Sequence, residues 1–212
     1  MPTLTSGTSP GGTCRALGAA ALGVALLASA AWAQDAPVRV RGTIERVDGP
    51  VYVVKSRDGA ELKLTLAPNG GVSAIVPAKL ADITPGKYIG VAAMPLADGS
   101  QKALEVSIFP EALRGLAEGF RPWDLQPKST MTNANVEATV ASTDGQVLTL
   151  KYKDGEKKII VPPDIPIVAF APGDVSDLKP GAKIFVGAAK KLPDGTLETS
   201  RVNVGKGIAP PM

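Results

Sequence analysis

Hydrophobic and polar residues alternate along most of the chain after residue 37, which is the pattern of half-buried β-strands. In the run AELKLTL, leucine fills every second position from 62 to 66, with Lys63 and Thr65 between. Two β-branched runs, VRVRGTIERV and VYVVKS, come before it, and the turns Asp48-Gly49 and Asp58-Gly59 separate the three runs. Asp-Gly between alternating runs favours tight hairpins. The pattern therefore predicts a three-stranded antiparallel meander with one dry face.

A less regular piece follows and leads into a predicted hairpin. It contains the apolar run 72–76 and ends at Pro85-Gly86, after which KYIGVAAM and QKALEVSIF flank the turn Asp98-Gly99. No stretch has the period of a long helix. The capping-type residues Asp82 and Asp174 allow a single helical turn, because a proline soon follows each of them.

The same order of runs and turns returns in the second half of the chain, which indicates an internal duplication. Four turn pairs match in order and in spacing: Asp48-Gly49 with Asp144-Gly145, Asp58-Gly59 with Asp154-Gly155, Pro85-Gly86 with Pro180-Gly181, and Asp98-Gly99 with Asp194-Gly195. Each copy holds about five strands, in the order meander, crossover and hairpin, as in a small OB-type barrel. We expect an all-β fold of two tandem OB-like barrels, 38–110 and 136–207. The binary pattern does not separate this barrel from other small barrels.

The strand and turn motifs resemble those of the exported bacterial DUF5666-type domains, which are OB-like and uncharacterised. The first copy carries GTIERVDG, VKSRDG and DITPGKYIGV, and the second carries ATVASTDG, KYKDG and DLKPG. The central run RGLAEGFRPWDL, with STMTNA after it, is similar to a signature of two-module exported relatives. Some of those relatives are labelled metal ABC transporter permeases. A permease needs several spanning helices, which this chain lacks, so the resemblance implies a fold and not an activity.

The first 33 residues have the pattern of a secretory signal peptide. Arg15 precedes an Ala-rich apolar run, 16–31, and Ala31-Trp32-Ala33 follows it. The run is shorter than the ~20 apolar residues of a spanning helix. We expect cleavage after Ala33 and a protein of the periplasm or the medium with no integral membrane span after processing. A retained membrane anchor is the alternative.

Composition excludes several kinds of chemistry. The chain has no histidine and one cysteine, Cys14, which lies in the expected signal peptide. Histidine-based acid–base catalysis and typical zinc or copper sites are therefore absent, and we predict no cofactor, no metal site and no catalytic residues. Carboxylates that could bind a hard cation show no clustered spacing. The formal charge of +3 falls to +2 without Arg15, too small a surplus to imply a nucleic acid partner.

The segment 111–135 belongs to neither copy and joins them. It contains Trp123, and its glycines and prolines disfavour a continuous helix. One interpretation is a strut, in which Trp123 is buried with its indole N–H bonded and packs across both barrels. The other is a ligand cleft between the modules, lined by Arg121 and Trp123. For either role the candidate residues are Arg114, Glu118, Phe120, Arg121, Trp123 and Asp124. We expect the strand aromatics elsewhere to pack inside the barrels.

These observations predict a non-catalytic exported module that binds a ligand or has a structural role, with a periplasmic protein or a small molecule as its partner. An accessory role in metal or solute uptake is one alternative, which only the labels of the relatives suggest. A carboxylate-based enzyme acting on glycans is another. It would need two carboxylates facing each other across a cleft, which Glu111, Glu118 and Asp124 could supply only if folding brought them together.

Overall fold

The computed structural model describes residues 37–143 and 145–211, which belong to one compact unit. The predicted signal peptide, 1–33, lies outside the described residues. Within them, no helix is long and apolar enough to cross a membrane. The all-β prediction is confirmed, since the only helices described are three single turns of 3-10 helix.

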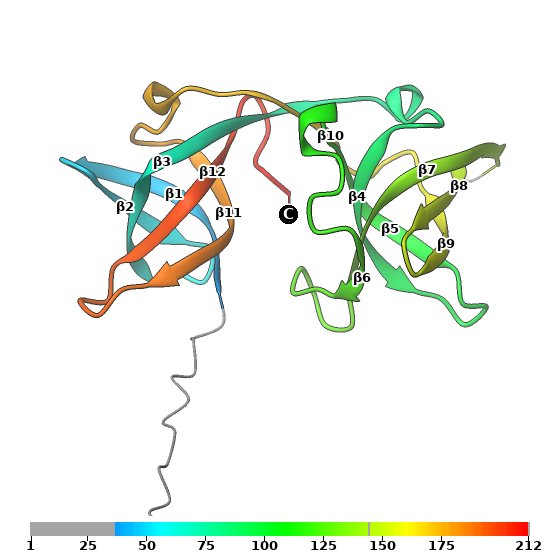
Figure 1. Ribbon diagram of the computed structural model, residues 1–212, viewed down its shortest axis with the longest axis horizontal. Coiled ribbons are helices and arrows are strands. Elements are labelled where there is room, and N and C mark those ends of the chain that lie inside the picture. Colours follow the sequence, from blue (N-terminus) through cyan, green and yellow to red (C-terminus); the bar gives the residue numbers. More distant parts are fainter. Residues whose placement is uncertain (1–36, 144, 212) are drawn as a thin grey trace, which may run out of the picture. The chain divides into compact units, whose positions relative to one another are not determined.

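Strands make up most of the described chain (Figure 1). The first half contains β1 (Val38–Asp48), β2 (Val51–Ser56), β3 (Glu61–Pro77), η1 (Leu80–Asp82), β4 (Tyr88–Pro95) and β5 (Gln101–Ile108). The central segment contains η2 (Glu111–Leu113) and β6 (Gly119–Pro122), and it ends before the strand that begins at Thr130. Residues 130–135 are therefore part of a strand and not of the connecting segment 111–135 that the sequence predicted. The second half contains β7 (Thr130–Ser142), β8 (Gly145–Tyr152), β9 (Gly155–Val161), β10 (Ile167–Pro172), η3 (Val175–Asp177), β11 (Lys183–Lys191) and β12 (Leu197–Gly205).

Five strands form a first closed barrel, here called barrel one. β1, β2 and β3 are the predicted meander, and β11 and β12 complete the ring. β1 pairs antiparallel with β11, and β3 pairs in parallel with β12. In Figure 1 the blue and cyan strands of this barrel therefore lie beside the orange and red ones. A meander closed by a hairpin, with one parallel contact, agrees with the predicted OB-like arrangement.

Barrel two has the same pairing pattern in a different chain order. Its meander is β7, β8 and β9, and its hairpin is β4 and β5. β4 pairs antiparallel with β7, and β5 pairs in parallel with β9. The hairpin thus precedes the meander along the chain, so barrel two is a circular permutation of barrel one.

The copies therefore exchange their hairpins, which differs from the expectation that 38–110 and 136–207 each close a barrel of their own. Barrel one combines the meander of the first copy with the hairpin of the second, and barrel two does the reverse. The exchange follows from β3, which continues as a strand from Glu61 to Pro77 and does not fold back onto its own meander. The hairpins make equivalent contacts whether they are exchanged or not. Alternation and turn residues therefore predict the two barrels, but not which copy supplies the hairpin of each barrel.

The end of β3 and the short β10 join both barrels in one twelve-stranded sheet. β10 pairs antiparallel with β3 and in parallel with β5. Each barrel keeps its own apolar interior. The predicted dry face of β3 is confirmed, because Leu64 is fully buried in barrel one with Leu62 and Leu66 packed beside it. Leu148 and Leu150 have the same role in barrel two.

The crossover pieces confirm the predicted single helical turns. η1 and η3 occupy matching positions, and the Asp174 side chain accepts a hydrogen bond from the Ser176 N–H at the start of η3. The turns that follow are also alike. Gly86 and Gly181 have φ angles of 86° and 87°, a left-handed conformation that favours glycine.

Candidate functional site

The central segment is structured from end to end and rests on barrel two. β6 pairs antiparallel with β7, and Arg121 lies opposite Met131 in this ladder. Two non-glycine residues, Ala117 and Lys128, adopt left-handed backbone conformations with φ of 47° and 66°. These mark the sharp bends on either side of β6 and of the loop that carries Trp123. A loop fixed in this way presents its side chains in a defined position.

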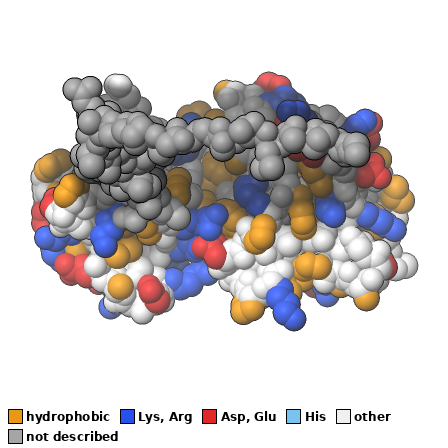
Figure 2. All heavy atoms as spheres, turned by 60° about the horizontal axis from the view of Figure 1, so that its bottom comes forward, with side chains coloured by type: hydrophobic (Ala, Val, Ile, Leu, Met, Phe, Trp, Pro, Cys, Tyr) orange, Lys and Arg blue, Asp and Glu red, His pale blue; other side chains and the backbone are white. Residues whose placement is uncertain are grey.

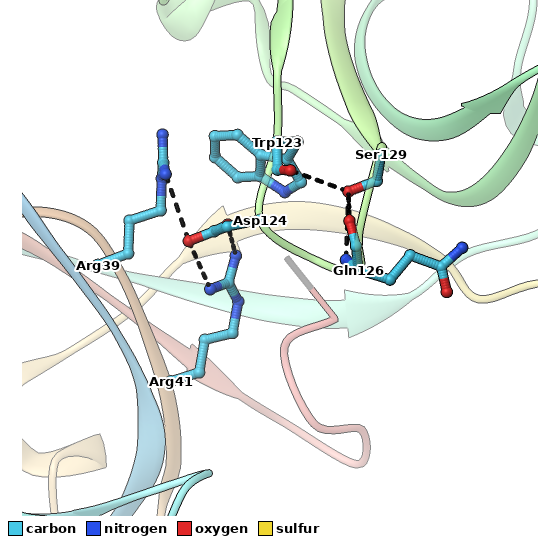
Figure 3. A network of polar contacts seen from close by, with 6 residues as sticks. All are labelled: Arg39, Arg41, Trp123, Asp124, Gln126 and Ser129. Carbon is cyan, nitrogen blue, oxygen red and sulfur yellow. Dashed lines mark hydrogen bonds and ion pairs between the residues drawn. The ribbon is translucent and has the colours of Figure 1, made fainter.

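Trp123 sits at the tip of this arrangement. Its backbone N–H donates to the Ser129 carbonyl at 2.8 Å, and the buried Ser129 hydroxyl bonds the Trp123 carbonyl at 3.1 Å (Figure 3). It packs against a small cluster formed by Ala92 and Met131 of barrel two and Phe185 of barrel one. The guanidinium of Arg39 lies 4.0 Å from the ring centroid, which is a cation–π contact.

Asp124 ties the same loop to β1. Its carboxylate accepts from Arg41 at 2.8 Å and forms an ion pair with Arg39 at 3.3 Å (Figure 3). Partial burial acts to raise the pKa of Asp124, but the hydrogen bond and charge of Arg41, helped by Arg39, hold it below its usual value. The carboxylate therefore remains charged at neutral pH and joins the segment to barrel one.

A pocket of about 360 Å³ lies beside Trp123. Arg121 and Trp123 line it, as the cleft interpretation predicted. Its other walls come from Phe109, Phe170 and Phe185, from Arg39 and Arg201, and from Asn133 and Asn203, with smaller residues such as Gly187 and Ala188. Figure 2 shows basic and hydrophobic side chains next to each other on the face turned forward. Aromatic walls with a few polar groups are typical of small-molecule sites.

The phenylalanines were expected inside the barrels, and this is wrong for Phe170 and Phe185. Phe185 packs on the outside of barrel one with Trp123, and Phe170 joins the same cluster. Phe170 also stacks on Phe109, with 4.8 Å between centroids and 16° between planes. The signal for this was the unbroken apolar run Ile184-Phe185-Val186, since a strand with two dry faces is covered on both sides.

Several buried polar atoms at the pocket have no hydrogen-bond partner within the described part of the protein. They are the Nε of Arg39, the indole Nε1 of Trp123 and the side-chain carbonyl oxygens of Asn133 and Asn203. Each amide is oriented by its other end. Asn133 donates to the Leu116 carbonyl at 2.9 Å, and Asn203 donates to the Phe185 carbonyl at 3.1 Å. None of these atoms has accessible surface in this structure, so they are polar groups left without a partner behind the pocket wall and not contacts for a ligand.

The strut interpretation is thus only partly right. Trp123 packs against both barrels, but it is half-buried, and its indole N–H has no partner among the described residues. One side of the Trp123 ring is not covered by the barrels and lines the pocket. The segment joins the barrels and lines a pocket at the same time.

Arg121 carries a weakly compensated charge. One of its terminal nitrogens donates to the Ala117 carbonyl at 2.7 Å, and its guanidinium lies 5.5 Å from the Trp123 ring centroid. Within residues 37–143 and 145–211 it forms no ion pair. Burial, and then the nearby charge of Arg39, lower the pKa of Arg121. The site therefore favours an added negative charge at this position.

The other three candidate residues have structural partners outside the pocket lining. Arg114 bonds Glu111, the Gly86 carbonyl and Asn135. The Glu118 carboxylate accepts from the Lys153 N–H at 3.0 Å. The Phe120 ring is 40% exposed and lies 4.5 Å from the Lys157 ammonium. These contacts fasten the segment to barrel two.

The carboxylates of the segment are likewise engaged separately. Glu111 pairs with Arg114, Glu118 caps the Lys153 N–H, and Asp124 pairs with Arg39 and Arg41. Among the described residues, no three side chains of Asp, Glu, Cys or His come together as metal ligands would. The groups of this segment thus hold the chain in place.

Glu105 of β5 was not singled out by sequence analysis. It lies opposite Ala92, which belongs to the cluster around Trp123, and only 1% of it is exposed. Its carboxyl oxygens have no partner in the portion of the chain that is described. Burial raises the pKa of Glu105 to about 8, although Arg41 and Arg57 act in the opposite direction. Folding thus removes an unpartnered carboxyl group from water.

Comparisons with known proteins found no match to a family model, a curated protein or a solved structure. The resemblance to DUF5666-type domains therefore remains a prediction.

Proposed function

We propose that the protein is an exported, non-catalytic binding module that holds a small molecule in the pocket beside Trp123. The observation that carries the proposal is the pairing of aromatic walls with arginines that form no ion pair among the described residues. An apolar pocket with a few convergent polar groups is the usual form of a small-molecule site. Phe170, Phe185 and Trp123 supply the walls, and Arg121 and Arg201 supply the charge.

The exchanged hairpins support this role, because they fix the two sides of the pocket relative to each other. β4 and β11 lie in different barrels and each contributes to the cluster around Trp123, through Ala92 and Phe185. The loop of Trp123 is bonded to itself through Ser129 and to β1 through Asp124. A pocket held by rigid strands loses little entropy when a ligand binds.

Export remains part of the proposal on the strength of the N-terminal pattern. Arg15, the apolar run and Ala31-Trp32-Ala33 favour a protein that meets its ligand in the periplasm or the medium. A binding module in that compartment would also suit an accessory role in solute uptake, in which the pocket captures the solute.

A pocket-filling substitution tests the proposal. Gly187 lines the pocket, and a Cβ added there would meet only the Phe185 ring, at 3.7 Å. Gly187→Phe should therefore fill the pocket without straining the backbone. Val140→Phe is the matched control, because Val140 is 61% exposed and does not line the pocket.

The measurement is a thermal-shift screen of small molecules against the wild type and both variants. Compounds that raise the melting temperature of the wild type should do the same for Val140→Phe and should have no effect on Gly187→Phe. Equal shifts in all three proteins would place binding elsewhere and overturn the proposal.

A further inference from the structure

The pocket walls carry an excess of positive charge. Among the described residues that line the pocket, three are arginines, Arg39, Arg121 and Arg201, and none is acidic. Of these arginines only Arg39 has an ion pair within the described chain, and it shares Asp124 with Arg41. An anionic group enclosed beside two unpaired arginines would gain charge-assisted hydrogen bonds. The charge of the site therefore selects an anion.

Arg121 is placed to bind that anion with two hydrogen bonds. A guanidinium has five N–H donors in a planar fork, and the described contacts of Arg121 use one of its terminal nitrogens. The remaining donors match the two oxygens of a carboxylate. A bound carboxylate would also offset the burial and the Arg39 charge that act on Arg121.

The remaining walls favour a flat ring. Trp123, Phe109, Phe170 and Phe185 surround the space, and Phe109 and Phe170 are already stacked on each other. Aromatic rings gain from stacked or edge-to-face contacts beyond the area they bury. An inorganic anion or an aliphatic acid would leave these contacts unused.

The volume of the pocket limits the size of the ligand. About 360 Å³ accommodates one or two rings.

We infer that the pocket takes a planar aromatic carboxylate. The inference rests on the proposed function, since it names the ligand class of the same site. It makes the carboxylate the partner of Arg121, and the ring the partner of Trp123 and the phenylalanines.

The test is titration calorimetry with three probes: 2-naphthoate, its neutral amide and inorganic phosphate. The wild type should bind the acid most tightly. The amide should bind about tenfold more weakly, because it lacks one charge-assisted pair. Phosphate should not compete at comparable concentrations.

Charge-removing variants tie the preference to this site. Arg121→Gln should weaken the acid about tenfold and leave the amide unchanged. Arg201→Gln, at an exposed position, is a second variant with little risk to folding. Arg57→Gln is the matched control, since Arg57 is exposed and does not line this pocket.

The outcomes separate the two proposals. If acid and amide bind equally well and Gly187→Phe abolishes both, the ligand class is wrong while the binding function stands. If phosphate displaces 2-naphthoate at similar concentration, the aromatic part of the inference is overturned. If Gly187→Phe changes no affinity, both proposals fail.

Discussion

Ile75 of β3 and Phe170 of β10 lie directly opposite each other in an antiparallel ladder, although they occupy equivalent positions in the two sequence copies. Each stands ten residues before the proline of its Pro-Gly turn, Pro85 or Pro180. The same ladder pairs Ser73 with Pro172 and Pro77 with Val168, so equivalent positions are interchanged across it. The duplicated halves thus meet about a local two-fold relationship centred on this pair, as the subunits of a two-fold dimer would.

This relationship predicts that the first copy folds only as a dimer. A fragment of residues 34–110 contains the meander of barrel one and the hairpin of barrel two. Two such fragments can exchange hairpins and complete two barrels, with Ile75 of one opposite Ile75 of the other. We expect sedimentation to show a dimer and the melting temperature to rise with protein concentration. A folded monomer at low concentration would contradict the exchanged arrangement.

Replacement of Trp123 by alanine should destabilise the protein by about 2 kcal/mol, less than the 3–5 kcal/mol of a fully buried aromatic. The ring is half-buried but contacts both Met131 and Phe185. Urea denaturation measures the change. Trp123→Phe is the control, because it keeps an apolar ring in the cluster, and it should recover most of the loss. A silent Trp123→Ala would mean that the loop does not pack on the barrels.

The Asp124 clamp should contribute less than about 1 kcal/mol, because its carboxylate is 46% exposed and is screened by salt. Since folding lowers the pKa of Asp124, its contribution is present above the unfolded pKa and is lost as pH falls through the folded pKa. Asp124→Asn should therefore reduce stability at pH 7 and have no effect below pH ~2. Urea titrations at low and high salt would check this, and a salt-independent effect would contradict it.

Glu105 should make the protein less stable as pH rises. Its folded pKa of about 8 exceeds the ordinary 4.5, so between these values the native state holds a proton that the unfolded state has released. The contribution of Glu105 to the free energy of unfolding is therefore greatest below pH 4.5. It falls by roughly 1 kcal/mol per pH unit between pH 4.5 and pH 8. The charges of Arg41 and Arg57 reduce this effect.

Glu105→Gln provides the check, since glutamine keeps the shape and does not ionise. The variant should be more stable than the wild type at pH 8 and should show a flatter profile of unfolding free energy against pH. The matched control is Glu198→Gln, in the matching hairpin of barrel one, where no fully buried carboxyl is lost. Identical pH profiles for wild type and Glu105→Gln would contradict the assigned burial.

The sequence predicted the local structure well, because period-two alternation and turn residues report on which face of a strand is dry. Leu64 and the turn at Gly86 are as expected. It did not predict the exchange, which depends on whether the chain bends or continues near Asn69, where both choices satisfy the same pattern. Arg121 and Trp123 were found because they lie in a segment that belongs to neither copy.

The rest of the pocket comes from residues whose environment depends on packing between distant strands. Phe185 and Glu105 both lie on outer barrel faces that a solitary barrel would expose to water. In the folded chain both are buried. The alternation within a single strand does not predict that its outer face is buried. The unbroken apolar run around Phe185 was nevertheless a usable signal.

The exchanged hairpins also set the order in which the protein can become complete during synthesis. All strands of barrel two lie between Tyr88 and Val161, whereas barrel one begins at Val38 and needs β12, which ends at Gly205. Until the last strand leaves the ribosome, β1 and β3 have open edges that can pair with other chains. Barrel two can therefore fold first. A chain truncated before β12 would leave barrel one open, with strand edges that are prone to aggregation.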